Sequence, residues 1–194
     1  MRFILILTLF SQALFGQYFG QNKVQYNEFD WNFIVSPNFN VYYYGDNDDL
    51  AIFTSKVAEE SLDQIGKHLR WRSQQPIKII VYTSHNDFQQ TNIVNVYMSE
   101  GIGGVTELYK NRIVIPFEGS YAQFKHVIHH ELVHAIINDM VYGGNVQGVL
   151  SGRVILQVPL WANEGLAEFL SVDWDTNSDM VLRDLAIEES LPEV

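Results

Sequence analysis

The stretch His130-Glu131-Leu132-Val133-His134 governs the interpretation of this sequence, because it places two imidazoles and a carboxylate on one predicted helix. An α-helix has 3.6 residues per turn, so His130 and His134 lie one turn apart on the same face and could bind one metal ion together. Glu131 lies about 100° around the helix from His130, where it can reach a water molecule bound to that ion. The stretch therefore predicts a metal site with a carboxylate beside it.

The residues around this stretch predict a buried helix. They are apolar on almost every side of it: Val127, Ile128, Leu132, Val133, Ala135, Ile136 and Ile137. A helix that is hydrophobic all round is buried, and polar side chains within it need partners because unpaired buried polar groups are costly. In zinc-dependent peptidases the H-E-x-x-H spacing meets that need, since the histidines bind zinc and the glutamate acts as general base. The alternative is a core helix whose histidines are hydrogen-bonded within the protein.

A second predicted helix follows Pro159 and carries Glu164 and Glu168 one turn apart. Like charges at this spacing destabilise an isolated helix, so the pair requires a cationic partner. Catalytic zinc takes three protein ligands and leaves the fourth position to water. We therefore interpret Glu164 as the third ligand, and Glu168 as a carboxylate that accepts the remaining ring N–H of His130 or His134. A solvated polar stripe is the alternative for the glutamate pair.

Together these residues resemble the gluzincins, the peptidase MA clan of zinc metallopeptidases, in which an H-E-x-x-H helix precedes a helix with the N-E-G-x-A-E pattern found at 163–168. The segment Trp161–Glu168 is similar to the W-x-N-E-G-x-A motif of the M1-family aminopeptidases. The stretch Asn111–Ser120, followed by Phe124 and the zinc helix, resembles the peptidase-MA-like module at the front of secreted bacterial TolB-like propeller proteins. The resemblance covers most of the chain from about Phe39 onward.

The resemblance implies zinc-dependent hydrolysis of peptide bonds, with Zn²⁺ as cofactor, a peptide or protein as substrate, Glu164 as third ligand and Glu131 as base. In full-length relatives it implies a downstream propeller domain. The M1-family aminopeptidases also carry a G-x-M-E-N strand whose glutamate binds the free amine of the substrate. Here the strand keeps Gly104 and Glu107 but lacks the methionine and the asparagine. Glu107 is therefore either a substrate-binding residue or an ordinary strand residue, and endopeptidase and aminopeptidase activity both stay open.

Two further residues are candidates for the same site. His126, one turn before His130, could line the cleft or act as an alternative ligand. The family stabilises the oxyanion with a tyrosine or histidine, and Tyr142 is the nearest candidate after the zinc helix. Two other functions remain compatible with the motifs: a scaffold module that keeps zinc without turnover, and a zinc hydrolase that acts on a non-peptide bond.

The first sixteen residues predict a signal peptide. Arg2 supplies a short positive segment, and the apolar run from Phe3 to Phe10 is too short to span a bilayer. We expect cleavage before Gln17, a secreted or periplasmic location, and no stable membrane insertion after cleavage. Without Arg2 the chain has 11 basic and 23 acidic residues, a net charge of −12, which disfavours nucleic acid and anionic membrane surfaces. The absence of cysteine excludes a disulfide framework.

The remaining residues, 17–194, predict one α+β domain, incomplete at its C-terminus: a small mixed β-sheet followed by zinc-binding active-site helices. Gly165 lowers helix propensity in the middle of the second helix, and we expect it to mark a close approach of the two helices. Apolar and β-branched runs predict strands at 31–35, 39–44, 76–83, 105–109 and 113–116. The predicted helices cover 48–69, 87–90, 121–140, 160–170 and 178–190, with a glycine-rich connection at 143–152.

Overall fold

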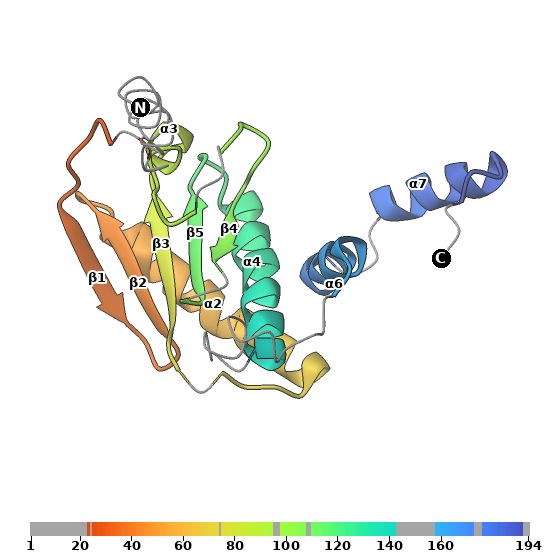
Figure 1. Cartoon of the computed structure of the whole chain (residues 1–194), viewed down its shortest axis with the longest axis horizontal. Helices are drawn as coiled ribbons and strands as arrows, with labels where there is room; N and C mark the ends of the chain where they lie inside the picture. Colours follow the sequence, from red (N-terminus) through yellow and green to blue (C-terminus); the bar gives the residue numbers. More distant parts are fainter. Residues whose placement is uncertain are drawn as a thin grey trace, which may run out of the picture.

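The computed structural model describes residues 23, 25–73, 75–94, 98–107, 110–142, 158–172 and 176–191. In chain order the elements are β1 (Trp31–Val35), β2 (Phe39–Tyr44), α2 (Asp48–Leu69), β3 (Ile77–Tyr82), α3 (His85–Phe88), β4 (Val105–Glu107), β5 (Arg112–Pro116), α4 (Tyr121–Tyr142), α6 (Leu160–Val172) and α7 (Thr176–Ile187) (Figure 1). The predicted α+β class is confirmed. The glycine-rich connection and the predicted signal peptide lie outside the described residues.

The described strands form one mixed sheet in the order β1-β2-β3-β5-β4. The central pairs, β2 with β3 and β3 with β5, are parallel, whereas the outer pairs, β1 with β2 and β4 with β5, are antiparallel. Strands β4 and β5, which are consecutive in the chain, thus pair antiparallel, with Thr106 opposite Ile113. As a result β4 lies at one end of the sheet order, and α4 packs against β4 and β5.

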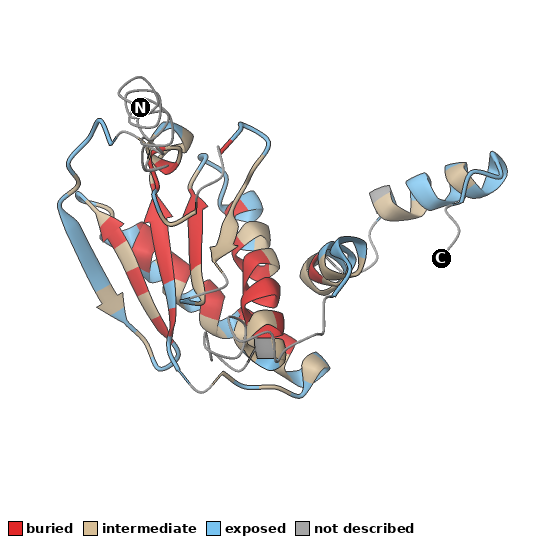
Figure 2. Ribbon diagram, viewed as in Figure 1, coloured by how far each residue is buried: buried red, intermediate tan, exposed pale blue. Residues whose placement is uncertain are grey.

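Helices α2 and α4 share the larger hydrophobic core with one face of the sheet (Figure 2). Residues of α4 contribute to that core from more than one side, because the helix contacts the sheet, α2 and α6. Ile128, Leu132 and Ile136 have no exposed surface. The apolar pattern of this helix predicted burial, and the helix is covered on three sides by the sheet, α2 and α6. Residues 130–134 therefore lie in a closely packed part of the domain.

The other face of the sheet carries a smaller core of Ile80, Tyr82, Phe88, Met98 and Val114. Phe88 comes from α3, a single turn whose N-cap Ser84 accepts a hydrogen bond from the backbone N–H of Asp87. The described part of the segment between α3 and β4, residues 89–94 and 98–104, packs against this core through Ile93, Val94 and Ile102. It thereby forms one wall of the site described below.

Several element boundaries differ from the sequence prediction by one to three residues, among them those of β3, α3, β5 and α6. Helix α4 continues to Tyr142, two residues beyond the predicted end, and α7 begins at Thr176 and ends at Ile187 instead of running from 178 to 190. Shifts of this size are usual because helix ends fray and terminal turns are assigned by weak hydrogen bonds. No helix within the described ranges is long and apolar enough to cross a membrane.

Candidate metal centre

Three side chains from α4 and α6 converge on one point at the edge of the domain. His130 Nε2 and His134 Nε2 lie 3.2 Å apart on α4, as expected for residues one turn apart. Oε2 of Glu164, on α6, lies 3.4 Å from each of these nitrogens. The structure thus brings together the three residues that the sequence predicted as metal ligands, although they come from two helices separated along the chain.

The three donor atoms fit a tetrahedral metal ion. Bond lengths of about 2.0–2.1 Å to nitrogen and oxygen and tetrahedral angles would separate neighbouring ligand atoms by roughly 3.3–3.4 Å. The distances of 3.2–3.4 Å between His130, His134 and Glu164 match that spacing. Two neutral imidazoles and one carboxylate are also ligand types that zinc prefers, with one position left open.

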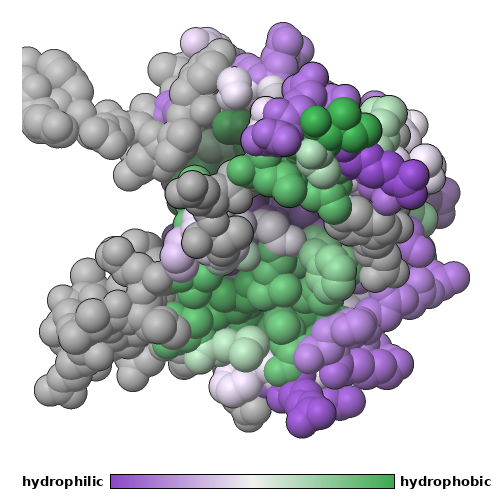
Figure 3. Space-filling model, turned by 90° about the vertical axis from the view of Figure 1, so that its right-hand side faces the viewer, coloured by the Kyte–Doolittle hydropathy of each residue, from purple (hydrophilic) through white to green (hydrophobic). Residues whose placement is uncertain are grey.

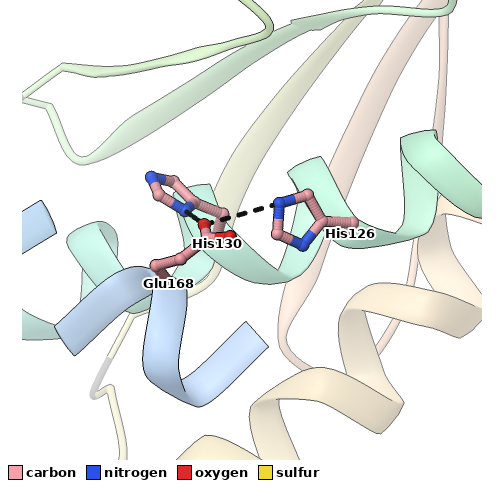
Figure 4. A group of neighbouring side chains, drawn as sticks. All are labelled: His126, His130 and Glu168. Carbon is pink, nitrogen blue, oxygen red and sulfur yellow. Dashed lines mark hydrogen bonds and ion pairs between the residues drawn. The ribbon is translucent and has the colours of Figure 1, made fainter. Parts of the chain in front are cut away.

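Glu168 lies close to the rings of His130 and His126 (Figure 4). Its Oε2 is 3.2 Å from Nδ1 of His130 and 3.6 Å from Nε2 of His126, so one carboxylate on α6 faces two imidazoles on α4. His126, His130 and Glu168 also form a second group of potential ligands. However, an imidazole that binds a metal through Nε2 normally keeps its proton on Nδ1 and donates it to a carboxylate. We therefore interpret Glu168 as the hydrogen-bond acceptor that orients His130.

Glu131 is buried, and its carboxylate contacts the sheet. Its Oε2 accepts a hydrogen bond of 2.6 Å from the hydroxyl of Thr106 on β4. Burial raises the pKa of the Glu131 carboxyl above its ordinary value, and the hydrogen bond from Thr106 lowers it in part. A raised pKa makes this carboxylate a better proton acceptor than an exposed glutamate.

The ligand group opens into a cleft of about 670 Å³ between the segment leading to β4 and the helices α4 and α6. Its apolar lining includes Met98, Ile102, Val105 and Val127, and Glu131 lies in its wall. The face of the molecule that carries α6 and α7 is hollowed, with largely hydrophobic surface above and below the hollow (Figure 3). An apolar cleft with a few convergent polar groups is the usual form of a small-molecule or peptide site.

Other residues that the sequence singled out have different outcomes. The carboxylate of Glu107 binds Nε of Arg112, its cross-strand neighbour, and does not line the cleft. Side chains alternate along a strand, so Thr106 faces α4 and Glu107 faces the other way. The side chain of Tyr142 lies outside the described residues. A Cβ added at Gly165 would meet no described atom within 4 Å, so the predicted close helix approach at this glycine is wrong.

Sequence reasoning missed Thr106, and it named Gly104 only as part of the aminopeptidase motif. Comparison with the aminopeptidase strand drew attention to Glu107, whereas strand alternation alone puts Gly104 and Thr106 on one face. That alternation was the available signal. Alternation predicts which residues share a face of the strand. It does not predict that this face contacts Glu131, because β4 and α4 are separate elements of the chain.

The sequence pattern that defines the Peptidase MA superfamily matches residues 57–194. The chain belongs to this superfamily. The match covers β3, β4 and β5 and the two helices that carry the site, α4 and α6. For this peptidase MA domain, membership suggests metal-dependent proteolysis. Comparison with curated proteins and with solved structures found no match.

Proposed function

We propose that this peptidase MA domain is a gluzincin-type endopeptidase that hydrolyses peptide bonds with zinc, His130, His134 and Glu164 being the ligands and Glu131 the general base. The main support is the convergence of three ligand atoms at 3.2–3.4 Å from one another in a cleft whose wall also contains the Glu131 carboxylate. Membership in the superfamily supports the same chemistry.

Each of these groups would have a separate role in the reaction. Bound zinc would supply a Lewis acid that acidifies water and polarises a carbonyl group. Glu131 takes a proton from the attacking water and delivers it to the leaving amine. Glu168 holds the proton on Nδ1 of His130, which leaves Nε2 free as a ligand and fixes the plane of the ring.

The edge of the sheet supports a peptide as substrate. Among the described strands β4 is last in the sheet order, and Val105 and Thr106 of β4 line the cleft. An extended peptide could pair with the main chain of such an edge strand, which aligns its backbone without regard to side chains. Because the Glu107 carboxylate is already paired with Arg112, it is not available for a free α-amine, which supports endopeptidase over aminopeptidase activity.

We also propose that the domain spans residues 17–194 and is exported to the periplasm or the medium after removal of residues 1–16, as in the secreted propeller proteins that the sequence resembles. The support is the apolar run that follows Arg2. Expression in a bacterial host with export machinery should give a mature chain that begins near Gln17. Mass determination of the N-terminal peptide is the measurement, and recovery of intact Met1 from the cytoplasm would contradict the proposal.

The proposed activity should be tested with the purified chain and a library of internally quenched peptides. We expect cleavage within the peptides, including those with acetylated N-termini, and loss of cleavage with a chelator that is reversed by about one equivalent of zinc. Zinc binding without cleavage would instead support a scaffold. Cleavage restricted to ester or other non-peptide bonds would support a different zinc hydrolase.

A further inference from the structure

Strand β4 makes a direct contact with the carboxylate of Glu131. The hydroxyl of Thr106 lies 2.6 Å from Glu131 Oε2 and 3.0 Å from the backbone carbonyl oxygen of the same residue. A hydroxyl has one proton to donate, and the shorter contact with the charged acceptor is the stronger one. Thr106 therefore donates its hydroxyl proton to the carboxylate of Glu131, and its oxygen also lies close to the backbone carbonyl of that residue.

Gly104, the residue just before β4, leaves space for the other carboxylate oxygen. A Cβ at position 104 would lie 2.9 Å from Cγ and 3.0 Å from Oε1 of Glu131, and 2.9 Å from Cγ2 of Ile115. Such distances are far shorter than van der Waals contact. Glycine at 104 thus allows the Glu131 side chain to lie close to the backbone just before β4. Thr106, two residues further along and on the same face, binds the carboxylate at the end of that side chain.

This contact matters because, in the part of the chain that the structure describes, the Thr106 hydroxyl is the hydrogen-bond donor to the Glu131 carboxylate. The histidines and Glu164 would be held by the ion they bind, whereas a general base that does not bind the ion needs another constraint on its side-chain torsions. A buried carboxylate also needs a hydrogen-bond donor to remain charged at low cost. The Thr106 hydroxyl supplies both the donor and the constraint.

On the basis of the proposed function, we propose that Thr106 is a positioning residue that, against the surface left open by Gly104, holds the Glu131 carboxylate in the orientation required for proton transfer. It acts through Glu131 and does not itself exchange protons with the substrate. The contact joins β4, the edge strand that would pair with the peptide, to α4, the helix that carries the base. The strand would therefore align the substrate and the base together.

The test compares Thr106→Val, which removes the hydroxyl, with Thr106→Ser, which keeps it. Misplacement of a catalytic group by about 1 Å can cost about 10²-fold in rate. We expect Thr106→Val to lower kcat about 10–100-fold, with KM and zinc content close to those of the wild type, and Thr106→Ser to restore most of the rate. Thr54→Val is the matched control, because the Thr54 hydroxyl makes a buried 2.7 Å hydrogen bond to the Leu50 carbonyl on α2, away from the cleft.

A merely structural Thr106 would give a different pattern. In a Glu131→Gln background the base is already lost, so Thr106→Val should change the residual kcat by less than about twofold if it acts through Glu131. An equal drop in both backgrounds, or unchanged kcat in Thr106→Val alone, would overturn the proposal. Thr54→Val should leave kcat unchanged in either background.

A second measurement does not depend on catalysis and separates this proposal from the proposed function. In urea unfolding of the zinc-loaded chain, Thr106→Val and Glu131→Met should be coupled by about tenfold or more in the unfolding equilibrium constant, as expected for a hydrogen bond to a charged group. Additive effects of the two changes would refute the contact even if the wild type cleaves peptides. Clear coupling in a chain that cleaves nothing would support the contact and refute the peptidase function alone.

Discussion

Replacement of Glu131 by glutamine should lower the kcat of peptide hydrolysis by about 10²–10⁴-fold, the usual effect of losing a general base. Glutamine has nearly the same size and can still accept a hydrogen bond from Thr106, so the fold should be kept. The three predicted ligands are untouched, so zinc content should stay near one per chain. Because the base acts mainly in the transition state, KM should change far less than kcat. Steady-state kinetics and metal analysis on the same preparation measure all of these quantities.

The control for this variant is Glu60→Gln, which makes the same chemical change at an exposed position of α2. It should leave kcat, KM and zinc content unchanged. If the wild type and Glu131→Gln hydrolyse peptides at the same rate, the proposed mechanism is wrong. If both hold zinc tightly and neither cleaves peptides, a scaffold function replaces it.

Replacement of Glu164 by alanine should remove zinc at concentrations that saturate the wild type, since it leaves only the two histidines as protein ligands. The stabilisation of the fold by zinc should disappear with it, because binding free energy adds to folding free energy. Glu168→Ala on the same helix is the matched comparison. It removes a carboxylate that faces the ring of His130 and should weaken zinc by about 10–100-fold without abolishing binding.

Equilibrium dialysis gives the two affinities, and thermal unfolding with and without zinc gives the linked change in stability. Full zinc retention by Glu164→Ala would contradict the proposed ligand set and shift attention to His126 and Glu168, which lie close to the His130 ring. Unchanged zinc affinity in Glu168→Ala would mean that this carboxylate has no part in orienting the ligand.

The features that could be predicted from the sequence are those that depend on spacing within one element. The apolar surroundings of residues 130–134 predicted a buried helix, and the i, i+4 spacing put His130 above His134. The strand boundaries at 31–35 and 39–44 are confirmed because alternation and turn residues are local signals. The convergence of Glu164 with the histidines was predicted from a chemical requirement, because two like charges one turn apart needed a cation, and from the resemblance to the gluzincins.

The features that could not be predicted depend on contacts between elements. Nothing local to Thr106 says that its hydroxyl meets Glu131, and nothing local to His126 says that it shares the Glu168 carboxylate with His130. The sequence predicted a close contact at Gly165, which has open space around it, whereas a Cβ at Gly104 would meet the side chain of Glu131. The sequence alone does not say which of two glycines lies against a neighbouring side chain, because that depends on how the elements pack together.

The burial of α4 on three sides limits how a domain of this kind could be adapted to a new substrate. Between residues 128 and 137 its apolar side chains are buried in the core. His130, Glu131 and His134 of the same stretch line the cleft around the proposed ion, so few residues of this stretch are free to change. Of the residues on α4 outside the motif, His126 and Val127 line the cleft. Variation in specificity would therefore fall on the opposite wall, where Met98, Ile102 and Val105 can change in size without disturbing the helix that carries the chemistry.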